Sequence, residues 1–524
     1  MSRQAGMGPI PGFLIALVAG AAVGSVVQTQ FNLLALQQLG VEIALATRLS
    51  ATAQDLLHFA PLYAAVFGVS FLASTLITGA ALKLLGWPAR SFFHALGAAI
   101  GLWLTFTLVN TFAPMPTLIA ATRTSTGLAA MALAAAFAGW LYARLTATRA
   151  GATGGDAPVW LLAALAGAPG LAPEAQAQTA AHYQIQELAV GLSHPWSLAF
   201  LPDGGALITE RSGQLRRLTP DGALSDAPIA GVPPVFVSGQ AGLFDVTLAP
   251  DFPDSRLVLL SYACGTASAN HLCLARARLG AQRLEQVTEI FRTHPAKRGN
   301  AHYGGRMAWL PDGSLVVGLG DGFDYREQAQ ILGNHLGSLV RLWPDGSVPD
   351  DNPLVSEPGA RPEIYSYGHR NVQGLVYDPV GERLISHEHG PRGGDEINLI
   401  RPGANYGWPV VSFGRDYTGA LVTPFTERAG MAPPLLQWTP SIAPSGMTLY
   451  RGELFPQWQG DLLIGALAER SVHRVSLAGG QARDVEVLFQ ELEARIRDVI
   501  TGPDGALYLL TDSENGQLLR IAPK

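Results

Sequence analysis

Five short, glycine-rich segments in the C-terminal two thirds of the chain carry polar side chains that turns alone do not require. They cover residues 239–242, 300–306, 367–374, 387–396 with a continuation to 408, and 495–498. Each segment alone has an ordinary explanation, because paired glycines make turns and a single His or Asn is more often a satisfied surface or core group. Their occurrence together predicts a site that is assembled from several loops.

Three of these segments contain residue types with a definite chemical preference. Arg495 and Arg497 are two residues apart, so both side chains face the same side if they lie on a strand. Two guanidinium groups on one face favour an anionic ligand, the alternative being a solvated salt-bridge pair. Glu396 and Tyr406 offer oxygen atoms to a hard cation, as do the backbone carbonyls of residues 390–391.

The polar segments belong to a repeated unit of an apolar run, a turn and a second apolar run. Turns such as Pro-Asp-Gly separate the two runs, which is typical of β-hairpins. The unit occurs six times, at 196–211, 243–263, 306–321, 372–390, 446–467 and 497–512. This repetition predicts an all-β, six-bladed β-propeller with insertions in blades three to five. A β-sandwich is the alternative, but it would not explain the repeat.

The distribution of charge divides the chain into two parts. Of the 35 basic and 41 acidic residues among 524, residues 1–150 hold only 7 and 2. The remaining 28 basic and 39 acidic residues give the second part a net charge of −11, which argues against nucleic acid as a partner. Only 15% of the whole chain is charged, against roughly a quarter in soluble domains. The composition therefore excludes a single soluble domain and also a wholly membrane-embedded protein.

Four apolar stretches in the first part predict transmembrane helices. They cover residues 10–27, 56–82, 92–112 and 124–143, and a spanning helix needs about 20 apolar residues. If the N-terminus is inside, the basic residues of the short loops lie five inside and two outside: Arg3, Lys83, Arg90, Arg144 and Arg149 against Arg48 and Arg123. The excess of basic residues on the cytoplasmic side predicts this orientation, which leaves residue 150 in the cytoplasm.

A fifth apolar segment, residues 158–171, is too short for an ordinary span. Basic residues precede it and small residues follow it at 175–177, and these are the parts of a secretory signal. We expect this segment to export everything after it, with or without cleavage near residue 177. A Pro/Ala-rich linker is the alternative. The predicted domains are a four-helix transmembrane region at 1–150, a linker at 151–182 and a propeller at 183–524.

The chain has two cysteines, Cys264 and Cys273, in the segment SYACGTASANHLCLARARL. Apolar stretches flank a loop rich in small and polar residues, as in a hairpin. A disulfide across that hairpin would suit an oxidising compartment, and two free buried thiols are the alternative.

Six motifs, in this order, resemble the PQQ-dependent sugar dehydrogenases: GQAGLFDVTLAPDF, HYGGRMAWLPDG, YSYGHRNVQGL, GDEINLIRPGANYGWP, APSGMTLY and RIRDVITGPDG. The most similar branch is the aldose sugar dehydrogenases of the glucose/sorbosone dehydrogenase family, and the match covers about residues 183–524. The resemblance implies a six-bladed propeller that holds pyrroloquinoline quinone (PQQ) and calcium at the mouth of its channel. This blade number agrees with the six repeats counted above.

The resemblance also implies roles for individual residues. His302 is expected to be the general base that takes the proton from the sugar C1 hydroxyl while hydride passes from C1 to the PQQ C5 carbonyl. Imidazole suits this task because its unperturbed pKa of ~6.5 lies near working pH. Arg370 is expected to bind the quinone and to stabilise the oxyanion that develops on it. The other expected cofactor-binding residues are Gln240, Asn371, Arg470, Arg495 and Arg497.

Two calcium sites follow from the same resemblance. The backbone carbonyls of Gly390 and Pro391 match those that bind the calcium on PQQ, where the ion acts as a Lewis acid. Glu396 and Tyr406 match a second, structural calcium site.

The sequence departs from the family pattern at three places. Ala301 occupies the position before the catalytic histidine where the glucose-oxidising branch has an acidic residue, so glucose is not predicted as the specific substrate. Residues 468–470 correspond to a basic cofactor-binding segment but keep only one basic residue, Arg470. The four N-terminal helices are not part of the family pattern.

The expected function is therefore oxidation of aldose sugars at C1 to the lactone by a membrane-anchored enzyme. The catalytic domain is expected to face the periplasm from a bacterial inner membrane and to pass electrons to a quinone or a small redox carrier. A non-redox sugar-binding or lactonase-like propeller is the alternative, and a lactonase would want several carboxylates converging on one metal. A third hypothesis makes the helices an electron-transfer module, but the chain has no CxxCH haem motif, so we expect an anchor.

Overall fold

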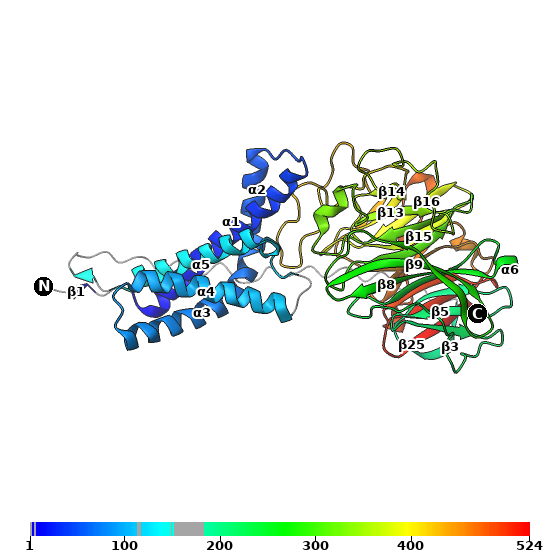
Figure 1. Cartoon of the computed structure of the whole chain (residues 1–524), viewed down its shortest axis with the longest axis horizontal. Coiled ribbons are helices and arrows are strands. Elements are labelled where there is room, and N and C mark those ends of the chain that lie inside the picture. Colours follow the sequence, from blue (N-terminus) through cyan, green and yellow to red (C-terminus); the bar gives the residue numbers. More distant parts are fainter. Residues whose placement is uncertain (1–2, 5–6, 113–116, 148, 151–182) are drawn as a thin grey trace.

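The computed structural model describes residues 3–4, 7–112, 117–147, 149–150 and 183–524. The chain forms an elongated bundle of helices followed by a ring of small β-sheets, and the two parts meet end to end (Figure 1). The predicted signal-like segment at 158–171 lies outside the described residues.

The helical part consists of α1 (Pro9–Gln38), α2 (Leu45–His58), α3 (Ala60–Leu85), α4 (Arg90–Phe112), the 3-10 turn η1 (Ala120–Arg123) and α5 (Ser125–Leu145). Four of these, α1, α3, α4 and α5, are long and apolar enough to cross a membrane, as the four apolar stretches predict. Close packing relies on small residues, since a Cβ at Gly20 would overlap Ala138 and one at Gly139 would overlap the backbone of His94. Such small residues let helices approach closely in lipid, where no hydrophobic force drives them together.

Helix α2 is a separate element that the sequence analysis did not predict. The apolar stretch 56–82 was predicted as one span, but the helix is interrupted between His58 and Ala60. Pro61 explains the break, because a proline has no N–H to continue the helix before it and fits the first turn of a new one. Helix α2 projects from the end of the bundle that faces the propeller (Figure 1).

Six antiparallel sheets form the ring, which confirms the predicted six-bladed propeller. Five sheets have four strands and the first has three. The first three blades are β4 (Pro195–Phe200), β5 (Ala206–Glu210) and β6 (Gln214–Leu218); β7 (Leu243–Leu248), β8 (Leu257–Thr266), β9 (Ala269–Leu279) and β10 (Leu284–Arg292); and β11 (Gly304–Trp309), β12 (Leu315–Leu319), β13 (Ser338–Leu342) and β14 (Ile364–Tyr367).

The next two blades are β15 (Val372–Asp378), β16 (Arg383–Glu388), β17 (Asp395–Ile400) and β18 (Leu436–Trp438); and β19 (Pro444–Leu449), β20 (Leu462–Ala466), β21 (Ser471–Ser476) and β22 (Arg483–Leu488). The last blade combines β23 (Ile496–Thr501), β24 (Leu507–Thr511) and β25 (Gly516–Pro523) with β3 (Tyr183–Leu192) from the start of the domain. Pairing of β3 with β25 therefore closes the ring. Short helical turns occur at α6 (Phe252–Ser255), η2 (Arg326–Gln330), η3 (Pro456–Trp458), η4 (Ala478–Gly480) and η5 (Gln490–Leu492), and β1 (Arg3–Gln4) pairs with β2 (Arg149–Ala150).

The repeated apolar runs form the first two strands of each blade. The second strands β5, β12, β20 and β24 are buried at every position, because neighbouring blades cover both faces of each sheet. The turns between first and second strands, such as 201–205 and 502–505, lie at one face of the ring. The loops that precede each first strand lie at the opposite face, which we call the mouth.

Cys264 and Cys273 form a disulfide that links β8 and β9 across their hairpin, with the Cα atoms 6.0 Å apart. The hairpin disulfide expected from the sequence is therefore present.

Candidate active site

His302 lies in the loop before β11 and is held by an aspartate from the next loop along the chain. Its Nδ1 lies 2.7 Å from Oδ1 of Asp321, and because a carboxylate accepts, this ring nitrogen carries the proton. The other carboxylate oxygen accepts a hydrogen bond from Trp408 Nε1 at 2.8 Å. The arrangement leaves Nε2 of His302 with a lone pair, which is the form a general base requires.

The backbone of His302 has an unusual conformation and lies close to the backbone of Gly320. His302 has φ of 51°, a left-handed conformation that residues with a Cβ seldom adopt. A Cβ at Gly320 would overlap the carbonyl of His302, so a glycine is required there. Gln240 fixes the same turn by accepting a hydrogen bond from the His302 backbone N–H at 2.8 Å. These contacts hold the imidazole in a defined place at the mouth.

Burial, and then the positive charge of Arg370, lower the pKa of His302 to about 4. The side chain is only 4% exposed. The imidazole is therefore neutral at ordinary pH and ready to accept a proton. Burial also lowers the pKa of the neighbouring Lys297 to about 7, and its ammonium group donates to the carbonyl of Ala301 and lies over the ring of Tyr303.

Arg370 lies between the histidine and the predicted metal carbonyls. Its guanidinium group lies over Trp408, 5.2 Å from the ring centroid. It donates to the backbone carbonyls of His389, at 3.0 Å, and Gly390, at 2.6 Å. The Gly390 carbonyl predicted to bind calcium thus accepts a hydrogen bond here. Pro391 lines a second hollow beside Arg370, which Phe323, Arg326, Trp408, Asp416, Tyr417 and Val422 complete.

Arg495 and Arg497 face the same side, as their spacing predicts, and share one carboxylate. Both guanidinium groups lie near Oδ2 of Asp512, at 3.2 and 2.9 Å. His194 approaches the other oxygen at 2.9 Å. Although burial opposes it, Arg497 and its neighbours hold the pKa of Asp512 well below its ordinary value. Two guanidinium groups on a single carboxylate retain a positive charge that an anionic ligand could use.

Asn371 and Arg470 have different surroundings. Asn371 is buried, and its Oδ1 accepts from the backbone N–H of Gly304 at 3.1 Å. Arg470 is exposed and reaches only the carbonyl of Glu493, at 3.5 Å. Next to Arg470, the imidazole of His473 lies between two carboxylates, Asp484 at 2.7 Å and Glu469 at 2.9 Å.

Two carboxylates line a polar hollow next to Arg370. Glu388 is buried and binds His369 and Asn398, at 3.0 and 3.1 Å, while Glu396 lies opposite it on β17. Burial and the negative charge of Glu388 raise the pKa of Glu396 well above its ordinary value of 4.5. The hollow is completed by His389, Gly390, Gly394, Tyr406, Trp408, Val411 and Ser412.

Tyr406 also lines this hollow, but its hydroxyl group is already occupied. It donates to the carbonyl of Leu399 at 2.6 Å and accepts from the backbone N–H of Arg401 at 2.8 Å. Among the predicted cation ligands, Glu396 is therefore the one with a carboxyl group, to which Asn398 donates at 3.3 Å.

Asp321 escaped the sequence analysis, and Trp408 and Arg306 lie in the polar segments singled out there but were given no role. Asp321 ends the third repeat, and Trp408 is the second-last residue of the motif GDEINLIRPGANYGWP, but neither position by itself indicates contact with His302. Arg306 crosses the channel below the mouth to Asp498, at 3.0 Å, and Asp245, at 3.7 Å. An acidic residue directly after an apolar run, as in LVVGLGD, is a signal that could have identified Asp321.

Comparison with known proteins identifies the family. A family model described as glucose / sorbosone dehydrogenase matches residues 192–520. Aldose sugar dehydrogenase YliI of Escherichia coli is 44% identical over 347 residues, covering 65% of this chain and 93% of that protein. Quinoprotein glucose dehydrogenase B of Acinetobacter calcoaceticus is 27% identical over 407 residues, covering 62% and 84%.

Solved structures agree with this assignment. A crystal structure of a glucose dehydrogenase has a TM-score of 0.63 at 45% identity, covering 65% of this chain and all of that one. The PQQ-bound aldose sugar dehydrogenase of Streptomyces coelicolor has a TM-score of 0.53 at 29% identity, covering 65% and 98%. The resemblance read from the six motifs is confirmed, and the chain belongs to the glucose/sorbosone dehydrogenase family.

Proposed function

We propose that this protein oxidises aldose sugars at C1 to the lactone, with PQQ and calcium bound at the mouth of the propeller. The observation that carries the proposal is the buried His302–Asp321 pair, whose free Nε2 lies at the mouth beside Arg370. When bound, PQQ supplies the acceptor for the hydride that leaves C1, and calcium polarises the accepting carbonyl.

The residues of the mouth suit an anionic quinone. Arg495 and Arg497 share one carboxylate, and the guanidinium group of Arg370 lies over the face of Trp408. A planar guanidinium pairs with carboxylates in a fork and stacks on flat rings, so these groups fit a flat molecule with several carboxylates. Gln240 and Asn371 act by holding the His302 turn and the start of β11.

The hollow beside Arg370 suits a divalent cation. Glu388 and Glu396 face each other, and burial, followed by the negative charge of Glu388, raises the pKa of Glu396. A hard cation prefers such carboxylates together with nearby carbonyl oxygens, and Gly390 also lines this hollow. The ion would allow both carboxylates to remain ionised.

The chain's own groups account for the proton transfer. Nε2 of His302 accepts the proton of the C1 hydroxyl, and Asp321 stabilises the imidazolium that results. Trp408 and the backbone N–H of Phe323 hold Asp321 in place, at 2.8 and 2.7 Å. A lactonase-like function is less well supported, because the channel carboxylates Asp245 and Asp498 are paired with Arg306.

We also infer that the propeller lies on the periplasmic side of the membrane. It packs against the bundle end that bears Arg123, whereas Arg90 donates to the carbonyl of Thr146 at the other end. The end with more basic residues is expected to be cytoplasmic. The connection from residue 150 to residue 183 would then cross the membrane a fifth time, as the export hypothesis for residues 158–171 requires.

Reconstitution of the full-length protein tests the proposed activity. The purified chain in detergent is loaded with PQQ and calcium, and dye reduction is followed over a panel of aldoses. We expect lactone formation, and a loss of kcat in His302→Gln that leaves cofactor binding intact. Absence of both PQQ binding and activity with every aldose would refute the proposal. A reporter enzyme that is active only in the periplasm, fused after Lys524, tests the orientation. An active fusion is expected, and an inactive fusion would indicate the opposite orientation.

A further inference from the structure

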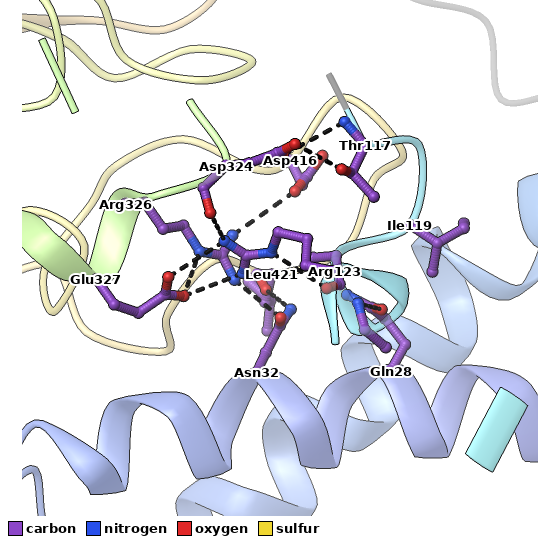
Figure 2. A network of polar contacts seen from close by, with 12 residues as sticks. Gln28, Asn32, Thr117, Ile119, Arg123, Asp324, Arg326, Glu327, Asp416 and Leu421 are labelled. Atoms are coloured by element: carbon purple, nitrogen blue, oxygen red, sulfur yellow. Dashed lines mark hydrogen bonds and ion pairs between the residues drawn. The ribbon is translucent and has the colours of Figure 1, made fainter. Parts of the chain in front are cut away.

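The end of the helical bundle that bears Arg123 contacts two loops that form the mouth of the propeller. The 321–331 loop follows β12 and includes η2, and the 405–425 loop belongs to the insertion between β17 and β18. A network of polar contacts joins both loops to α1 and to the segment before α5 (Figure 2).

Arg123 is the centre of the contact with the 321–331 loop. Its guanidinium group forms a fork with the Glu327 carboxylate, with N–O distances of 3.0 and 3.2 Å, and donates to the backbone carbonyl of Asp324 at 3.0 Å. Thr117 donates its hydroxyl to the Asp324 carboxylate at 2.6 Å. The Arg123 and Glu327 side chains are only 16% and 25% exposed. The forked geometry and the burial distinguish this pair from ordinary surface charges.

The transmembrane helix α1 contributes a second contact, which links the two loops. Asn32 accepts a hydrogen bond from Arg326 at 2.9 Å and donates to the carbonyl of Leu421 at 3.0 Å (Figure 2). Asp55 of α2 accepts from the backbone N–H of the same leucine at 2.8 Å. One residue of the 405–425 loop is thus held on both sides by the helices.

Apolar packing accompanies the polar contacts. Ala420 is fully buried within the cluster formed by aromatic residues of the bundle, including Phe59 and Tyr63. Val410 packs into another cluster with Leu33 of α1 and Ala51 of α2. An interface with both an apolar core and buried ion pairs resembles a permanent contact rather than a transient one.

The same two loops hold the catalytic histidine. Asp321, which binds His302, lies three residues before Asp324 and six before Glu327 in one loop. Phe323 packs against the imidazole with ring centroids 4.7 Å apart. Trp408, which fixes Asp321, comes from the other loop. No more than a few residues of backbone therefore separate the bundle contacts from the groups that orient the base.

We propose that the N-terminal helical domain is a positioning element of the active site, acting through Arg123, Asn32 and Thr117 on the loops that orient His302. The family model matches residues 192–520, all within the propeller, so this element is an addition to the part of the chain that defines the family. The inference rests on the proposed function for its catalytic consequence.

Although burial alone would raise it, Arg123 and Arg326 hold the pKa of Glu327 at about 2. The carboxylate therefore stays charged at every working pH and the fork persists. Loss of Arg123 would remove the fork and leave the buried carboxylate with Arg326 alone, whose Nε lies 3.0 Å from Glu327 Oε1. The 321–331 loop would then lose its ionic contact with the bundle and move toward solvent. A shift of about 1 Å at a catalytic group can cost about 100-fold in rate.

The test uses the full-length protein in detergent and the variant Arg123→Met. Hydrogen exchange is measured first on the cofactor-free protein. We expect exchange in the 321–331 loop to become at least about tenfold faster, while blades that do not touch the bundle keep the exchange of the parent. In the loaded enzyme we expect kcat to fall about tenfold or more, with the aldose KM changed less than twofold, because the base moves and the sugar contacts do not.

Two further variants make the test specific. Arg123→Lys keeps the charge without the fork and should give values between those of the parent and Arg123→Met. Arg217→Met removes an arginine that pairs with Asp203 at 2.6 Å, at the face opposite the mouth, and should change neither loop exchange nor kcat. If Arg123→Met does not fold, Thr117→Val removes only the hydroxyl bond to Asp324 and should shift both readouts in the same direction by a smaller factor.

The results separate the possible outcomes. Parent-like exchange and kcat in Arg123→Met, or in Thr117→Val where that variant replaces it, would overturn the proposal, as would faster loop exchange with unchanged kcat. A uniform acceleration of exchange throughout the propeller would also overturn it, because it would indicate a general loss of stability. If the parent enzyme proves inactive with PQQ, the proposed function fails, but the exchange measurements still decide whether the bundle orders the loop.

Discussion

Replacement of Asp321 by Asn isolates the part of catalysis that depends on the His302–Asp321 pair. The substitution keeps the size of the side chain but removes a negative charge that lies 2.7 Å from Nδ1 of the imidazole. The charge matters most when His302 has taken the substrate proton, because only then is the imidazole positive. The change should therefore act on the transition state more than on the ground state.

The expected magnitude follows from the geometry. Two unit charges about 4 Å apart interact by about 4 kcal/mol at an effective dielectric constant near 20, and every 1.36 kcal/mol corresponds to about tenfold in rate. Loss of this interaction predicts a decrease in kcat of about 1000-fold. The Asn amide can also donate to Nδ1 and reverse the tautomer, which would take the lone pair from Nε2 and bring the loss toward about 10,000-fold.

The pH profile provides a second, independent readout. Burial and Arg370 lower the pKa of His302 to about 4, so the parent should keep its neutral base, and its kcat/KM, at all pH values above about 4. Asp321 favours the imidazolium, hence its removal lowers the pKa further and moves the acid limb to lower pH. Steady-state kinetics with one aldose over pH 3.5 to 8 measures both effects.

A matched control excludes a general effect of removing an aspartate. Asp345 lies in an exposed turn at the face opposite the mouth, where it binds only Ser347, and Asp345→Asn should keep full activity. A kcat of Asp321→Asn within tenfold of the parent, or an unchanged acid limb, would refute the assignment of His302 as the base oriented by Asp321.

Three further predictions concern stability. Although burial opposes it, the two carboxylate partners of His473 raise its pKa to about 9, so this histidine stabilises the fold below pH 6.5, and that contribution is lost as the pH rises through 9. His473→Gln should therefore lower the free energy of unfolding at pH 6 by about 1–2 kcal/mol, once solvent screening is discounted, and by much less at pH 10. Cys264→Ser with Cys273→Ser should cost about 2–3 kcal/mol in urea unfolding, because the disulfide closes a loop with a sequence separation of 9; reductant should have the same effect on the parent and none on the variant. Chelation of calcium should lower the Tm of the parent. In Glu396→Gln the decrease in Tm should be smaller, because the repulsion between Glu396 and Glu388 is gone. An equal decrease in both proteins would argue against this cation site.

The features that could be predicted from the sequence are those that depend on a short local pattern of residues. The repeated hairpins predicted six blades because the unit occurs six times, and its second runs, such as LVVGL of β12 and LLIGA of β20, are apolar because they are buried on both faces. Arg495 and Arg497 were predicted to face one side because strand geometry has a period of two. The four spans were recognisable because lipid requires long runs without charge.

Contacts between distant segments could not be predicted in this way. Arg123 and Glu327 are 204 residues apart, and each alone has the character of a surface charge. Trp408 reaches Asp321 across 87 residues through an insertion that carries no strand signal. Helix α2 was missed because its last residues merge with the apolar stretch of α3, and only Pro61 marks the boundary.

The place where the chain enters the propeller has a consequence for how the enzyme could leave the membrane. Tyr183 begins β3 and pairs with Pro523 at the face away from the bundle, while Ala150 lies at the bundle's far end (Figure 1). The connection between them, residues 151–182, is 32 residues long and lies outside the described residues. Thirty-two residues can extend over about 100 Å at most, and a membrane crossing as proposed above would use about 30 Å of that length. A protease that cut near residue 177 would cleave the chain before β3, whose pairing with β25 closes the ring. The contacts between the helical bundle and the propeller loops would remain intact. Such a cut would produce a nicked complex that stays on the membrane, and release of the enzyme would require undocking as a separate event.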